Sequence, residues 1–98
     1  MFRYIEKDNA LILIKDKKEV RFKCGTITFK LKEIKAGFRV SVYKANVEEV
    51  LQYKLGARVG YNIFNDFDSA YDYMYDLWDK MHKIKTKQIV EMFDRIFE

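Results

Sequence analysis

The spacing of the apolar residues changes once along this chain, near residue 65, and that change limits the folds open to it. Before this point apolar and polar residues alternate, as in Val20, Arg21 and Phe22. From residue 67 to residue 81 the apolar residues instead recur every three or four positions. Alternation predicts strands with one buried face, and a period near 3.6 predicts an amphipathic helix.

Strands followed by helices, rather than alternating with them, indicate an α+β fold. We expect an antiparallel sheet of four to six strands over residues 2–64. Two C-terminal helices, over about 66–82 and 86–97, are expected to cover one face of it. The chain of 98 residues fits one compact domain, 1–98. Thr86 is predicted to cap the final helix, whose apolar side would comprise Ile89, Val90, Phe93, Ile96 and Phe97.

Several shorter segments carry their own predictions. The apolar run Ala10–Ile14 predicts a short buried strand, and Gly25 interrupts an alternating pattern and so predicts a turn or bulge. Residues 46–55 fit a helix capped by Asn46 but fit a strand or loop equally well. Asn65 or Asp66 is expected to cap the first C-terminal helix.

Charge is distributed unevenly. Residues 1–60 carry 14 Lys and Arg against 7 Asp and Glu, whereas five aspartates and no basic residue lie between Tyr61 and Asp79. At about 100° per residue, four of these aspartates fall within about 80° of one helix face. An ordinary solvated helix face explains such a stripe, but a typical one mixes charges in i,i+4 pairs.

The preferred functional hypothesis uses this acidic stripe. We expect a small non-catalytic inhibitor or modulator that docks into a basic groove on a larger protein, in the extreme by imitating nucleic-acid phosphates. Tyrosine is enriched at interface hot spots, which adds the neighbouring tyrosine to the set. The candidate partner-binding residues are Asp68, Asp72, Tyr75, Asp76 and Asp79.

The alternative hypothesis is a nucleic-acid-binding domain that uses the polar face of the strands. Basic side chains can follow a phosphate backbone and a tyrosine offers a stacking surface, although a wet antiparallel sheet also carries lysines. The candidate residues are Arg21, Lys23, Lys30, Lys32, Arg39, Tyr43 and Arg58. The hydroxyl residues Thr26, Thr28 and Ser41 are expected to be exposed on the same face.

Signals for catalysis are weak, and we expect neither an enzyme nor a cofactor or metal site. No glycine-rich phosphate loop is present, since the segment 56–60 lacks the required spacing. Cys24 and His82 could act as nucleophile and base only if the fold brought them together. Asn65, Asp66 and Asp68 lack the glycine and distal glutamate of a calcium loop, so helix capping explains them better.

The compartment and the class of protein follow from composition. A single cysteine, no leader-like segment and no long apolar run predict a cytoplasmic protein without a membrane span. The order of basic strands before an acidic, aromatic helix resembles small sheet-plus-helix DNA-binding domains. The proline-free, lysine- and tyrosine-rich composition resembles small phage-encoded proteins that block host machinery. The oligomeric state stays open between a monomer and a homodimer joined through an edge strand.

Overall fold

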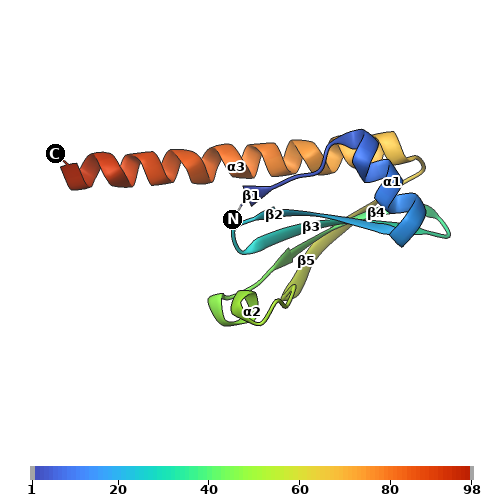
Figure 1. Cartoon of the computed structure of the whole chain (residues 1–98), viewed down its shortest axis with the longest axis horizontal. Coiled ribbons are helices and arrows are strands. Elements are labelled where there is room, and N and C mark those ends of the chain that lie inside the picture. Colours follow the sequence, from blue (N-terminus) through green and yellow to red (C-terminus); the bar gives the residue numbers. More distant parts are fainter. Residues whose placement is uncertain (1, 98) are drawn as a thin grey trace.

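A five-stranded antiparallel sheet lies beneath one long helix in the computed structural model, which describes residues 2–97 and the side chains of residues 2–87 (Figure 1). The α+β architecture expected from the sequence is therefore confirmed. The elements in chain order are β1 (Phe2–Arg3), α1 (Lys7–Lys17), β2 (Glu19–Cys24), β3 (Ile27–Ile34), β4 (Gly37–Lys44), α2 (Val47–Leu51), β5 (Ala57–Phe64) and α3 (Phe67–Phe97).

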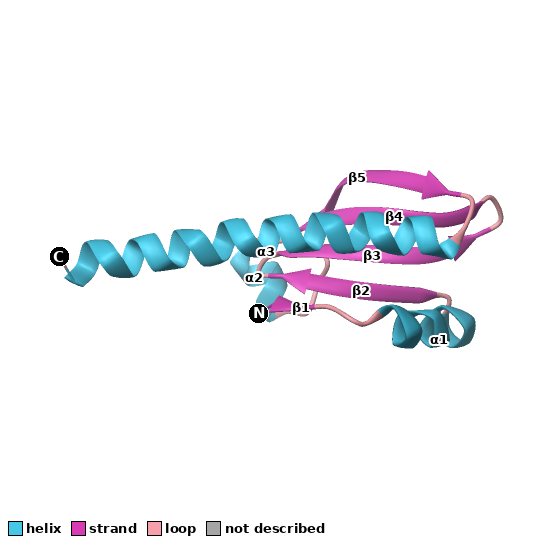
Figure 2. Ribbon diagram, turned by 90° about the horizontal axis from the view of Figure 1, so that it is seen from above, coloured by secondary structure: helices cyan, strands magenta, loops and turns pink. Residues whose placement is uncertain are grey.

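The strands follow one another across the sheet in the order β1-β2-β3-β4-β5, and each neighbouring pair is antiparallel (Figure 2). Tight turns join β2 to β3 and β3 to β4. Gly25 occupies the first turn with φ +63°, a conformation that glycine adopts without steric cost. The turn predicted at this residue is confirmed.

The core lies between the sheet and α3. Inward-facing residues of β2, β3 and β4 such as Phe22, Leu31 and Val40 are buried against the first half of the helix, where Met74 and Trp78 are buried too. The two periodicities of the sequence meet here, because alternate strand residues and every third or fourth helix residue supply the same core.

The prediction of a strand at Ala10–Ile14 is wrong, because these residues belong to helix α1. Ala10 and Ile14, four residues apart, are buried on one side of α1, whereas Ile12 between them is 63% exposed. A short apolar run does not distinguish a strand from a helix. The flanking charges do favour a helix, with Asp8 in its first turn and Lys15 and Lys17 in its last.

The C-terminal region forms one helix rather than the two predicted. α3 runs without interruption for 31 residues, so Thr86 lies inside it and caps nothing. No proline or glycine occurs after residue 60 to stop it. The apolar side predicted for the final helix lies outside the described side chains. The N-cap prediction holds for Asp66, whose Oδ1 accepts the Ser69 amide at 2.7 Å.

The segment left open at residues 46–55 contains the short helix α2. Asn46 caps it in a capping box, since its Oδ1 accepts the Glu49 amide at 2.7 Å and Glu49 accepts the Asn46 amide at 3.2 Å. Figure 1 places α2 on the side of the sheet opposite to α3. α2 therefore lies on the same side as the sheet face that α3 leaves uncovered.

Candidate functional site

The sheet face turned away from α3 collects all seven basic and tyrosine residues of the alternative hypothesis. Val20, Phe22 and Leu31 point into the core, so the residues that alternate with them point outward. The register pairs Arg21 with Lys30, Lys32 with Arg39, and Tyr43 with Arg58. Paired residues of an antiparallel sheet share a face. We call this surface the open sheet face, and its members include Arg3, Arg21, Lys23, Lys30, Lys32, Arg39, Tyr43, Arg58, Tyr61 and Ile63.

Like charges lie directly opposite one another on this face. The register places Arg21 across from Lys30 and Lys32 across from Arg39. A third like-charge pair brings Arg3 on β1 opposite Lys23 on β2. Such pairs destabilise a sheet unless an anion screens them. Glu19 lies on the same face, opposite Lys32 and 2.9 Å from Arg21, and offsets part of this repulsion. The basic residues still outnumber it, so the open sheet face carries an excess of positive charge.

Two tyrosine rings lie among these cations. Lys30 Nζ is 5.1 Å from the centre of the Tyr43 ring, and the Arg58 guanidinium carbon is 4.8 Å from that of Tyr61. Burial by itself raises the pKa of Tyr43. The hydrogen bond and charge of Lys30, with smaller effects of Ser41 and Arg58, outweigh burial and leave the pKa below its usual value. The lowered pKa of Tyr43 reflects the positive potential around it.

The structure corrects the exposure expected for two hydroxyl residues. Thr28 and Ser41 lie on the open sheet face but are buried, at 4% and 0% exposure. Their side chains are short and lie between longer ones on the neighbouring strands, such as Lys30 opposite Ser41 and Tyr43 opposite Thr28. Arginine, lysine and tyrosine side chains therefore form the accessible part of this face.

Three members of the open sheet face were missed by the sequence reasoning. Arg3 belongs to a two-residue strand, too short for alternation to be seen. Tyr61 and Ile63 lie on β5, where the register shifts opposite Val42 and Tyr43. Alternation of apolar and polar residues would have placed Tyr61 and Ile63 on the buried face, whereas the register puts them on the outer face with exposures of 54% and 50%.

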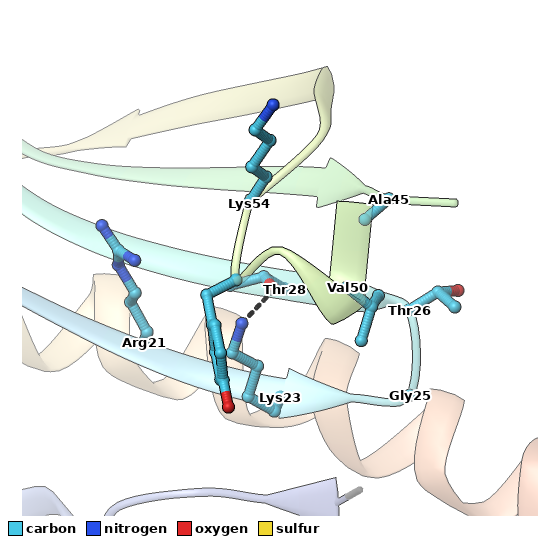
Figure 3. A pocket seen from close by; sticks show the side chains of 9 residues that line it. Arg21, Lys23, Gly25, Thr26, Thr28, Ala45, Val50 and Lys54 are labelled. Carbon is cyan, nitrogen blue, oxygen red and sulfur yellow. Dashed lines mark hydrogen bonds between the residues drawn. The ribbon is translucent and has the colours of Figure 1, made fainter. Parts of the chain in front are cut away.

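A cleft of about 380 Å³ lies at one end of the open sheet face (Figure 3). Residues of β2, β3 and their turn form one side of it. The other side comes from the segment between β4 and β5, which includes α2. The lining residues are Arg21, Lys23, Gly25, Thr26, Thr28, Ala45, Val50, Tyr53 and Lys54. Figure 3 shows the Lys23 amine directed at Thr28, whose Oγ1 accepts from Nζ at 3.1 Å.

The acidic stripe lies on α3, but its carboxylates are not unpaired as the sequence suggested. Lys7 of α1 reaches Asp72 at 3.0 Å and Asp68 at 3.6 Å. Lys80 and Lys83 pair with the aspartates one turn earlier, Asp76 and Asp79, at 2.8 Å each. The fold and the next helical turn supply bases that the interval 61–79 lacks. Tyr75 is 37% exposed and packs against Tyr4 and Trp78.

Among the side chains that the structure describes, no hydrogen bond joins the Cys24 thiol to His82. This thiol is fully buried, and its burial raises its pKa despite the opposing charge of Lys85. His82 stacks on the Trp78 ring at 4.9 Å and an interplanar angle of 8°. Among the side chains that the structure describes, no three His, Cys, Asp or Glu residues form a group able to hold a metal ion.

Comparisons with family models, with curated proteins and with solved structures give no match. Within the described residues, no helix combines the length and the apolar character that crossing a membrane requires.

Proposed function

We propose that this protein binds single-stranded nucleic acid on the open sheet face. The observation that carries the proposal is the set of like-charge pairs across the strands, Arg3–Lys23, Arg21–Lys30 and Lys32–Arg39. A phosphate backbone lying across these pairs would relieve their repulsion and release counterions, which is the main source of affinity for nucleic acids.

Exposed rings support a single-stranded ligand in particular. Tyr61 is 54% exposed, and Tyr43 lies on the neighbouring strand of the same face. Unpaired bases stack on such rings with little dependence on sequence, and each stacked base contributes about 1–3 kcal/mol. The eight residues of β3 span about 26 Å. This length accommodates a short stretch of an extended strand.

The test is fluorescence anisotropy with labelled oligonucleotides of about 12 nucleotides, within the usual range of site sizes. We expect binding that weakens steeply between about 50 and 200 mM salt. Lys30→Gln/Arg39→Gln should weaken binding at least tenfold. The matched control is Lys15→Gln/Lys17→Gln, which removes the same charge from the exposed end of α1 and should leave binding nearly unchanged. Absent binding, or binding that is indifferent to salt and to Lys30→Gln/Arg39→Gln, contradicts the proposal.

A second candidate function is docking of the acidic stripe on a larger protein with a basic groove, where the chain would act as an inhibitor or nucleic-acid mimic. The observation in its favour is accessibility, since the Asp68, Asp72 and Asp76 side chains remain 78%, 67% and 61% exposed. The ion pairs with Lys7, Lys80 and Lys83 weaken the case for this function, because they already neutralise part of the acidic charge. In a nuclease-treated bacterial lysate, Asp72→Lys/Asp76→Lys should lose a stoichiometric partner that the unaltered chain retains. Retention of that partner by the variant contradicts docking through this stripe.

A further inference from the structure

The cleft beside α2 is lined by positive charge and by no carboxylate. Arg21, Lys23 and Lys54 contribute to its lining, and none of the nine lining residues is acidic. Glu19 pairs with Arg21 at 2.9 Å. Lys23 and Lys54 form no ion pair within the part of the chain whose side chains are described. A concave surface with unpaired cations concentrates anions.

Lys23 lines this cleft, and a hydrogen bond holds its amine in place. One of its three amine donors is used by Thr28, whose Oγ1 lies 3.1 Å away. Burial, followed by the charges of Arg21 and Arg3, lowers the pKa of Lys23. An anion placed against the amine would offset both causes, because it would compensate for lost hydration and screen the neighbouring arginines.

The opposite side of the cleft offers an aromatic ring and apolar carbon. Tyr53 and Val50 both line it, and Tyr53 is 97% exposed. The backbone at Tyr53 is left-handed, with φ +58°, and is held by two hydrogen bonds. Its own amide donates to the Val50 carbonyl at 3.0 Å, and the Lys54 amide donates to the Glu49 carbonyl at 2.8 Å. The ring is therefore carried by an ordered turn.

We propose that this cleft binds a nucleoside monophosphate, with the phosphate on Lys23 and the base against Tyr53 and Val50. The cleft volume of about 380 Å³ is near the lower end of the range for small-molecule sites. The nucleotide comes either from solution or from the 5′-phosphorylated end of a strand bound to the open sheet face. Only the second source rests on the proposed function.

Isothermal titration separates these sources. Its first arm uses AMP, UMP and inorganic phosphate, and its second compares one oligonucleotide with and without a 5′-phosphate. We expect Lys23→Gln to weaken AMP binding at least tenfold. For the oligonucleotides, the same variant should lose the preference for the 5′-phosphate. Tyr53→Asn should weaken the same binding, because asparagine tolerates the left-handed backbone but lacks the ring. Lys15→Gln removes an equal charge from the exposed end of α1, outside the cleft lining, and should leave AMP binding unchanged.

Each outcome bears on the inference. Binding of AMP that Lys23→Gln removes supports it, even if no oligonucleotide binds, in which case the proposed function fails alone. Oligonucleotides that bind equally with and without the 5′-phosphate, together with no binding of AMP, overturn the inference and leave the proposed function standing. Phosphate binding as tightly as AMP removes the role of the base and overturns it as well. If Lys23→Gln lowers the thermal midpoint, the exposed Tyr53 decides instead, and undiminished AMP binding in Tyr53→Asn contradicts the inference.

Discussion

Trp78 is the residue that ties α3 to β2. It is 6% exposed, and its Nε1 donates to the Lys23 carbonyl at 2.7 Å. Its ring lies against those of Tyr4 and Phe22. The side chain therefore joins apolar burial to a hydrogen bond with β2, the same strand that contributes two cations to the open sheet face.

Replacing Trp78 by alanine should cost about 3–5 kcal/mol of unfolding free energy, because it removes a large buried ring. Trp78→Phe keeps most of the apolar contact but leaves the Lys23 carbonyl without its donor, at a cost of about 1–3 kcal/mol. Urea unfolding followed by circular dichroism measures both. Equal, small effects of the two changes would mean that the ring is not part of the core.

Ionisation of Tyr71 is expected to destabilise the fold at high pH. Its hydroxyl donates to the Ile5 carbonyl at 2.7 Å, and burial, followed by the influence of Tyr75 and Tyr4, raises the pKa of Tyr71 to about 12. Because its pKa is higher in the folded state, the protonated Tyr71 hydroxyl stabilises that state. This stabilisation is fully present below pH 10.0, the ordinary pKa, and is lost as the pH rises through the pKa of the folded state. We expect the thermal midpoint to fall above pH 10, and to fall less in Tyr71→Phe. Parallel curves for the two proteins would show that Tyr71 is not responsible.

At the scale of single elements, the β3–β4 turn depends on a residue without a side chain. Gly37 has φ +131°, and a Cβ at this position would collide with the carbonyl oxygen of Phe64 at the end of β5. Gly60 within β5 has open space where its Cβ would be. The two glycines therefore offer a matched pair of substitutions.

Gly37→Ala should lower the unfolding free energy by more than about 1 kcal/mol, because alanine fits neither the dihedral angle nor the space. Gly60→Ala should be neutral or stabilising, since alanine restricts the unfolded chain and meets no atom in the folded one. Chemical denaturation of both variants measures the difference. A destabilisation by Gly60→Ala as large as that by Gly37→Ala would contradict this account of the turn.

The sequence predicted the elements whose periodicity extends over many residues. β2, β3, β4 and the start of α3 lie where alternation or helical spacing placed them. It failed at Ala10–Ile14, where five apolar residues satisfy either structure and only contact with β2 makes Ala10 and Ile14 a helical face. The predicted break before Thr86 was wrong for a different reason. Thr86 has a side chain that can cap a helix, but no residue before it ends α3.

The candidate sites were predictable to different degrees. Alternation along single strands placed Arg21, Lys30 and Arg39 on one face, and the register then brought them together. The cleft was not predictable, because it joins β2 to residues near Tyr53, and no periodic pattern relates segments so far apart. The pairing of Lys7 with Asp72 was not predictable either, because the two residues are far apart in the sequence and residues 10–14 were expected to form a strand.

At the scale of the whole molecule, the helix is longer than the sheet that it covers. A helix of 31 residues measures about 46 Å, compared with about 26 Å for an eight-residue strand. The molecule is accordingly elongated, with extents of 53 × 26 × 21 Å. In both views the backbone of α3 continues past the sheet toward the C-terminus (Figures 1 and 2).

A chain ending at Lys87 should therefore keep the fold. The last described contact between α3 and the sheet is the bond from Lys85 Nζ to the Cys24 carbonyl at 3.2 Å, and this chain retains it. We expect the thermal midpoint of residues 1–87 to lie within a few degrees of the full chain, as measured by circular dichroism. A large fall that depends on protein concentration would instead indicate that residues 88–98 stabilise an assembly of several copies.

Neighbours in this sheet are also neighbours along the chain, so all five strands are complete before any of α3 has been made. At about 5–20 residues per second, synthesis of the 31-residue helix takes about 2–6 s. During that interval Phe22, Leu31 and Val40 are not covered by α3, although they are among the most deeply buried strand residues of the finished molecule. Nascent chains on neighbouring ribosomes are then most prone to associate through the apolar side of the sheet, and the arrival of α3 ends that exposure.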